Sequence, residues 1–196
     1  MAFSVQNIAE VIDAHGKDVV DDIIDGFSCR YNPEIDAYLR DRAIDFTRKS
    51  MTVTHLVFDE DTGLLVGYFA LTHKPVVFNA DALSGTQRKR VERFARLNSK
   101  TGTYTVSAFL IAQIGKNYLA KNGNLVSGGE LLALARNRLL AAKGQIGGQI
   151  VFVEMEHGNS KLAKFYTDNG FVLFGTRDEF ENGKPVTYDQ MFLFLK

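Results

Sequence analysis

Hydrophobic and polar positions alternate with two different periods along the chain. Apolar residues that recur every three or four positions predict helices over residues 7–27, 32–46, 84–97, 128–144 and 159–170. Alternating or continuous apolar runs predict strands on both sides of a hairpin loop at 59–63, and over 103–115, 149–156, 171–176 and 186–195. Mixed elements in this order predict one α/β (α+β) domain over residues 1–196, with N-terminal helices in 1–50 and a basic helical insertion at 84–100.

The segment from 103 to 156 has the pattern of a strand, a helix and a second strand. Such a crossover is right-handed and places its two strands in parallel. The strand at 149–156 is almost continuously apolar, which predicts burial on both faces of the sheet.

Composition narrows the class of protein. The 196 residues are 45% hydrophobic and 23% charged, which excludes a disordered chain, and the single cysteine excludes a disulfide framework. No apolar run approaches the roughly 18 residues that span a bilayer, and the N-terminus lacks a secretory signal. These features predict a cytoplasmic protein with no membrane partner. The four histidines are scattered, so no metal site is expected.

Charge is balanced overall but unevenly distributed. Lysine plus arginine number 23, as do aspartate plus glutamate, which argues against a protein that is basic over its whole surface. The segment 84–100 nevertheless carries six basic residues and one acidic residue. Both a partner surface and an ordinary solvated helix face agree with this pattern.

Candidate chemistry begins where the strand 103–115 ends. The loop that follows leads into a long helix whose first turn contains Ser127, Gly128 and Gly129. Free N–H groups and the positive end of the helix dipole make such a start an anion site, with Lys116 and Lys121 nearby. A diphosphate fits this chemistry, but so does an ordinary helix with glycines at its entrance.

A second candidate follows the strand at 149–156. Asn159 stands at the entrance of the next helix and Tyr166 near its end. A phenol at this place is either a core aromatic or a proton donor to a thiolate leaving group.

Three segments together resemble the GNAT superfamily of acyl-CoA-dependent N-acyltransferases: FLIAQIGKNY, NLVSGGELL and NSKLAKFYTDNGF. The upstream FSCRYNPEIDAYL is similar to a segment of a GNAT subgroup that includes bacterial toxins. The resemblance implies a mixed, mostly antiparallel, twisted sheet with splayed central parallel strands and helices on both faces. In the family's diphosphate loop, Q/R-x-x-G-x-G/A, Asn124 here replaces the first residue and Ser127 the first glycine.

The resemblance also implies roles for single residues. Tyr166 would protonate the CoA thiolate, and Glu154 is either the base for the amine or a carboxylate paired with a basic residue. Acetyl-CoA would be the co-substrate, with no metal. Its binding residues would be Gln113, Ile114, Gly115, Asn124, Ser127, Gly128, Gly129 and Asn159.

The implied activity is direct transfer of an acetyl group from acetyl-CoA to the primary amine of a small molecule or peptide. A homodimer is compatible with this activity. Two alternatives stay open. One is a toxin that acetylates aminoacyl-tRNA and is neutralised by an antitoxin, and the other is a CoA-binding module without catalysis.

Overall fold

The computed structural model describes residues 2–119, 125–181 and 183–196. The chain forms two compact units, the first from Met1–Thr72 with Ile111–Ala141 and the second from His73–Leu110 with Ala142–Lys196. Three long elements contribute to both units: β3 (Leu65–Asn79), β5 (Thr103–Lys116) and α6 (Gly128–Ile146). Among the described residues, no helix has the length and apolar character needed to cross a membrane.

The first unit contains N-terminal helices and the strand order β1-β2-β3-β5. Strand β1 pairs with β2, and β2 with β3, both antiparallel. Besides its parts of β3, β5 and α6, the unit comprises β1 (Phe3–Asn7), α1 (Ile8–His15), α2 (Lys17–Asp25), α3 (Pro33–Ala37), the π-helical turn η1 (Tyr38–Arg42), α4 (Ala43–Arg48) and β2 (Val53–Asp59).

Two adjacent residues of β3 show that helices cover both faces of this part of the sheet. Neighbouring side chains on a strand point to opposite faces. A Cβ at Gly67 would lie 3.1 Å from the Leu131 side chain, so α6 covers that face. Tyr68 points the other way and donates a hydrogen bond of 2.7 Å to the Ile35 carbonyl of α3.

Local signals set the ends of the N-terminal helices. The Asn7 side chain caps α1, and Gly16, with φ of 88°, separates α1 from α2. The predicted single helix over 7–27 is therefore two helices, since a residue with positive φ cannot continue a right-handed helix. Asn32 accepts a hydrogen bond from the Glu34 amide and Pro33 occupies the first turn of α3, as predicted.

The second unit has the strand order β3-β5-β6-β8-β7, with β4 paired to β5. Strands β5 and β6 run parallel through two residue pairs, Phe109 with Val151 and Leu110 with Phe152. Strand β8 pairs antiparallel with both β6 and β7. The remaining elements are the 3-10 turn η2 (Ala80–Ala82), α5 (Gly85–Val91), β4 (Leu97–Asn98), β6 (Ile150–Glu156), α7 (Ser160–Asp168), β7 (Val172–Glu181) and β8 (Lys184–Phe194).

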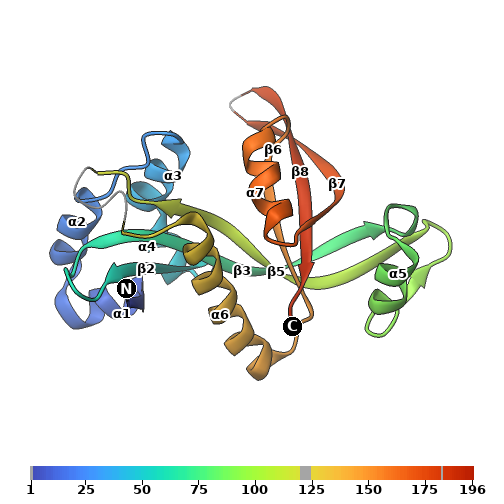
Figure 1. Ribbon diagram of the computed structural model, residues 1–196, viewed down its shortest axis with the longest axis horizontal. Coiled ribbons are helices and arrows are strands. Elements are labelled where there is room, and N and C mark those ends of the chain that lie inside the picture. Colours follow the sequence, from blue (N-terminus) through green and yellow to red (C-terminus); the bar gives the residue numbers. More distant parts are fainter. Residues whose placement is uncertain (1, 120–124, 182) are drawn as a thin grey trace. The chain divides into compact units, whose positions relative to one another are not determined.

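An aromatic cluster forms part of the core of this unit. The rings of Phe78 and Phe174 lie 4.4 Å apart and those of Phe78 and Phe192 5.0 Å apart. Helix α7 lies against β6 and β8 (Figure 1), where a Cβ at Gly170 would lie 3.5 Å from Leu193. The adjacent position on β8, Phe192, faces the opposite side of the sheet.

The predicted fold class is confirmed, with a mixed, mostly antiparallel sheet, a central parallel pair and helices on both faces. The sequence missed β1, and it extended the basic helix beyond the end of α5 at Val91. The prediction of one domain over residues 1–196 stays a prediction.

Candidate functional site

The end of β5 holds three of the predicted co-substrate residues. Gln113 and Ile114 are half-buried and Gly115 is buried. A Cβ at Gly115 would collide with Ile35 and would lie 2.9 Å from Cε1 of Tyr68. Glycine is therefore required at this position by packing inside the first unit, besides any role of its backbone.

The start of α6 is capped by its own side chains. The Ser127 amide donates a hydrogen bond of 2.8 Å to Oε2 of Glu130, and the Glu130 amide donates one of 3.1 Å to the Ser127 hydroxyl. These two reciprocal bonds form a capping box. A carboxylate of the protein thus occupies part of the position that the sequence assigned to a diphosphate.

The capping contact has an electrostatic consequence. Hydrogen bonds from the Ser127 hydroxyl and amide lower the pKa of the Glu130 carboxyl, so that it is ionised at neutral pH. Glu130 was not predicted from the sequence, although the Ser-x-x-Glu spacing is typical of a capping box.

Gly129 lies in the first turn of α6 with open space around it. A Cβ there would meet no atom within 4 Å. Glycine costs a helix interior up to about 1 kcal/mol relative to alanine, and the packing inside the protein does not require its small size here. This open space is what a closely approaching ligand needs. Asn124 and Lys121, the other predicted residues of the loop, lie outside the described residues.

Helix α7 carries Asn159 and Tyr166. The Asn159 side chain accepts a hydrogen bond of 3.1 Å from the Leu162 amide, which makes it the cap of α7. The Tyr166 ring is 4% exposed and packs edge-on against Phe165 and Phe171, with centroid distances of 5.3 and 5.4 Å. Its hydroxyl has no hydrogen-bond partner among the residues that the structure describes, and its oxygen is not one of the fully buried atoms that lack a partner.

Burial determines the protonation state of Tyr166. Removal of the phenol from water disfavours the phenolate and raises its pKa to about 12. The hydroxyl therefore keeps its proton at neutral pH and is a hydrogen-bond donor to whatever group lies beside it.

Glu154 lies on β6 and is held by side chains from β8, which pairs with β6, and from β7, which lies beyond β8. Arg177 of β7 binds both of its oxygens, with Nε 2.9 Å from Oε1 and Nη2 3.1 Å from Oε2. Gln190 of β8 donates a further hydrogen bond of 2.7 Å to Oε1. The carboxylate is thus paired with a basic residue, which is one of the two roles that the sequence left open.

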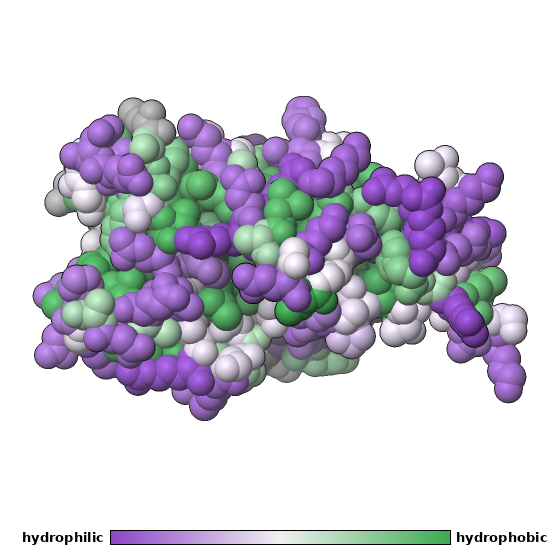
Figure 2. Space-filling view, turned by 90° about the horizontal axis from the view of Figure 1, so that it is seen from below, coloured by the Kyte–Doolittle hydropathy of each residue, from purple (hydrophilic) through white to green (hydrophobic). Residues whose placement is uncertain are grey.

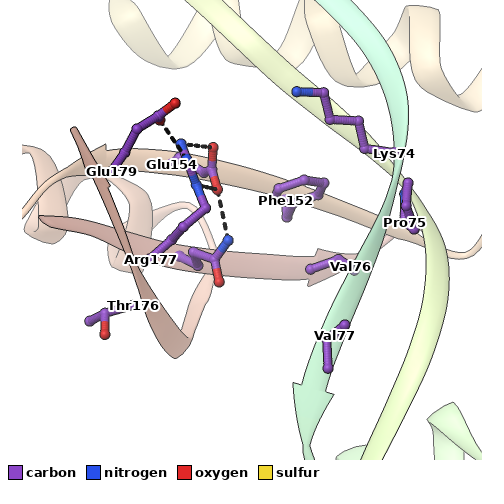
Figure 3. Close-up of a pocket in the computed structure, with 10 residues that line it drawn as sticks. Lys74, Pro75, Val76, Val77, Phe152, Glu154, Thr176, Arg177 and Glu179 are labelled. Atoms are coloured by element: carbon purple, nitrogen blue, oxygen red, sulfur yellow. Dashed lines mark hydrogen bonds and ion pairs between the residues drawn. The ribbon is translucent and has the colours of Figure 1, made fainter. Parts of the chain in front are cut away.

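These side chains line a pocket of about 520 Å³ inside the second unit (Figure 3). Arg177 also binds Glu179, so one guanidinium joins two carboxylates. Lys74 comes from β3 at the other side of the pocket. The complete lining is Lys74, Pro75, Val76, Val77, Phe152, Glu154, Thr176, Arg177, Glu179 and Gln190.

Within the second unit, Tyr166 and Glu154 belong to opposite sides of the sheet. Helix α7 packs on the face that carries Leu193, which pairs with Val151. Glu154 is three residues from Val151 and therefore points to the other face. Arg177 and Lys74 were not predicted from the sequence. Only the tertiary arrangement of the strands brings them to the pocket of Glu154, and spacing along the chain does not reveal this proximity.

The basic segment 84–100 belongs to the same unit. Arg88 donates a hydrogen bond of 2.7 Å to the Ala80 carbonyl, and the Arg90 guanidinium lies 3.6 Å from the centroid of the Phe194 ring. These two arginines therefore contact other parts of the unit and are only partly available to a partner. Strongly hydrophilic side chains gather over the α5 end of the unit in Figure 2. The exposed basic residues are Lys89, Arg93, Arg96 and Lys100.

Comparisons with solved structures give the class of the fold. AtaT complexed with acetyl-methionyl-tRNAfMet is 18% identical, with 96% of this chain and 95% of that chain covered and a TM-score of 0.61. A tyrosine-to-phenylalanine mutant of KacT is 20% identical, with coverage of 96% and 95% and a TM-score of 0.62. A mutant AtaT toxin bound to acetyl-CoA and the C-terminus of the antitoxin AtaR is 14% identical, with coverage of 98% and 93% and a TM-score of 0.58.

The chain therefore has the GNAT fold, as the resemblance of its sequence implied. No protein-family model matches it, and no curated protein matches it by sequence. Among the described residues, no group of three or more histidine, cysteine, aspartate or glutamate side chains is arranged to hold a metal ion.

Proposed function

We propose that the protein is an acetyl-CoA-dependent N-acetyltransferase that moves the acetyl group directly to a primary amine. The amine nitrogen forms a bond to the thioester carbonyl carbon, and the bond from that carbon to sulfur breaks. Tyr166 gives its hydroxyl proton to the departing sulfur, and the amine loses a proton to water or to a base.

The observation that carries this proposal is the state of Tyr166. Its ring is buried and fixed by Phe165 and Phe171, while its hydroxyl has no partner among the described residues. The hydroxyl oxygen is not among the fully buried atoms that lack a partner, so it is accessible to a ligand atom that accepts its hydrogen bond. General acids contribute about 10²–10⁴-fold to a rate.

The start of α6 supports acetyl-CoA as the co-substrate. Backbone N–H groups at a helix start bind phosphate oxygens, and the space at Gly129 admits a ligand close to the backbone. Glu130 would have to release the Ser127 amide when a diphosphate binds there. Solved AtaT bound to acetyl-CoA has the same fold.

The direct test measures thiol release from acetyl-CoA with a panel of small amines and peptides, beside the melting temperature with and without acetyl-CoA. We expect release with at least one amine, and stabilisation of about 2.7 kcal/mol at 100 times the dissociation constant. Stabilisation without release from any amine would favour the alternative of a non-catalytic CoA-binding module. The absence of both stabilisation and thiol release would contradict the transferase and the CoA-binding module alike.

The second candidate is a toxin that acetylates the amino group of an aminoacyl-tRNA and is neutralised by an antitoxin. It is favoured by the exposed basic residues between 84 and 100 and by the fold shared with AtaT, which was solved with acetyl-methionyl-tRNAfMet. The zero net charge argues against a wide basic surface.

Salt dependence separates the two candidates. If this segment binds a phosphate backbone, tRNA affinity falls steeply with salt, by a slope of about 0.7–0.9 per phosphate on logarithmic axes. Reversing the charge of Lys89, Arg93 and Arg96 should then abolish tRNA binding and leave acetyl-CoA binding intact, whereas Lys184→Glu is the control. Equal tRNA binding by all variants would reject the toxin alternative.

A further inference from the structure

The pocket beside Glu154 contains charges that the fold leaves incompletely paired. Arg177 carries one positive charge against the two carboxylates of Glu154 and Glu179. This cluster has a formal charge of −1. Lys74, on the β3 side of the same pocket, forms no ion pair with any described residue.

The hydrogen bonds show which carboxylate atoms remain available. Oε1 of Glu154 accepts bonds from both Arg177 and Gln190, whereas Oε2 accepts only one, from Arg177. Each carboxylate oxygen accepts about two hydrogen bonds, so Oε2 retains one acceptor position. Glu179 uses only its Oε2, on Arg177, and its side chain is 45% exposed.

The other side of the pocket offers donors. The Lys74 ammonium has three N–H groups, and none has a partner among the described residues. Phe152, which is 3% exposed, and the buried Val76 provide an apolar surface within the same lining. Figure 3 shows Lys74 on the β3 side of Phe152 and the Glu154–Arg177 pair on the other.

We propose that this pocket binds a small molecule that carries both an ammonium group and an anionic group. The ammonium lies on the free acceptor positions of Glu154 and Glu179, and the carboxylate or phosphate lies on Lys74. This inference goes beyond the proposed N-acetyltransferase function and does not depend on it, because the pocket lies on the face of the sheet opposite Tyr166.

In this arrangement Arg177 and Gln190 are positioning residues. They fix the Glu154 carboxylate through three hydrogen bonds from β7 and β8. Glu154 then binds the ammonium group as a cation. Loss of the Glu154 charge should consequently weaken the binding of the ammonium group.

The first test measures the binding of small probes by NMR titration in the absence of acetyl-CoA. The probes are O-phosphoethanolamine and β-alanine, which carry an amine with a phosphate or a carboxylate, and ethanolamine and ethyl phosphate, which carry one group each. We expect at least one of the first two probes to bind about tenfold more tightly than either single-group probe, as one charge-assisted contact is lost. The two double-group probes distinguish a phosphate from a carboxylate as the anion.

Variants assign the contacts. Lys74→Gln should lower the affinity for the double-group probes about tenfold and leave the affinity for ethanolamine unchanged. Glu179→Gln is an exposed change that leaves the Glu154–Arg177 pair in place. It should lower the affinity for ethanolamine and for the double-group probes. Lys184→Gln is the control for the loss of one exposed lysine on another part of the same unit.

The outcomes separate this inference from the proposed function. Equal effects of Lys74→Gln and Lys184→Gln, or no preference for double-group probes, would overturn the pocket assignment. Selective binding without thiol release from acetyl-CoA would instead support the pocket's selectivity and contradict the transferase.

Discussion

The Ser127 amide donates its hydrogen to Oε2 of Glu130 at 2.8 Å, at the point where α6 begins. A helix start attracts anions, and here the chain supplies one itself. Any diphosphate that binds at this helix start competes with that carboxylate. The residue that stabilises the free protein is thus expected to weaken the binding of acetyl-CoA.

Glu130→Gln should therefore tighten acetyl-CoA binding. The amide keeps the shape of the side chain but removes a negative charge from beside the diphosphate, and we expect an affinity gain of about 3- to 10-fold. Calorimetric titration measures it, with Glu60→Gln as an exposed control on another loop. Weaker binding by Glu130→Gln alone would show that the carboxylate assists binding.

Gly129→Ala should separate helix stability from ligand binding. Alanine meets no atom in the free protein and should raise the free energy of unfolding by up to about 1 kcal/mol. The added methyl group should nevertheless weaken acetyl-CoA binding, since it occupies the space at the helix start. Gly144→Ala, in the same helix and also without neighbours within 4 Å, should give the stability gain alone. Identical acetyl-CoA affinities in both variants would remove the α6 start from the binding site.

Gly115→Ala should destabilise the first unit. The new methyl group would collide with Ile35 and press on Tyr68, and overpacking of this kind costs about 1–3 kcal/mol. Urea unfolding measures the loss. An unchanged midpoint would mean that α3 moves aside freely, and that packing is not the reason for glycine there.

His55 makes stability depend on pH in the acid range. Burial of the imidazole, followed by the charge of Arg138, lowers its pKa to about 4. The folded state therefore resists protonation, so this stability is complete above pH 6.5 and is lost as pH falls through 4. The full effect is about 3 kcal/mol. Urea unfolding between pH 7.5 and 4 should show a shallower decline for His55→Gln than for the wild type or for His15→Gln, and parallel profiles would contradict this.

Much of the fold was predictable because its signals are local. Asn32 and Pro33 announce the start of α3, and the apolar run at 149–156 predicts the buried strand β6. Strand β1 was missed because five residues are too few to establish a period, and pairing with β2 decides its conformation.

The candidate site was less predictable for the same reason. Tyr166 and Asn159 could be proposed from one helix and its resemblance to a family. The pairing of Glu154 with Arg177 depends on strands 23 residues apart in sequence, and the position of Lys74 depends on the long strand β3. Contacts of this kind arise from tertiary structure and leave no periodic signal.

The central claim is tested most directly by the rate of acetyl transfer in Tyr166→Phe. The ring and its packing remain, and only the proton donor is lost. We predict a folded variant that binds acetyl-CoA nearly as tightly as the wild type and turns over about 10- to 100-fold more slowly. This loss is at or below the usual ~10²–10⁴-fold of a general acid, because a thiolate is a fair leaving group without a proton. Tyr31→Phe, at an exposed tyrosine, should keep the full rate. Wild-type turnover in a well-folded Tyr166→Phe protein would contradict the role of Tyr166 as the proton donor.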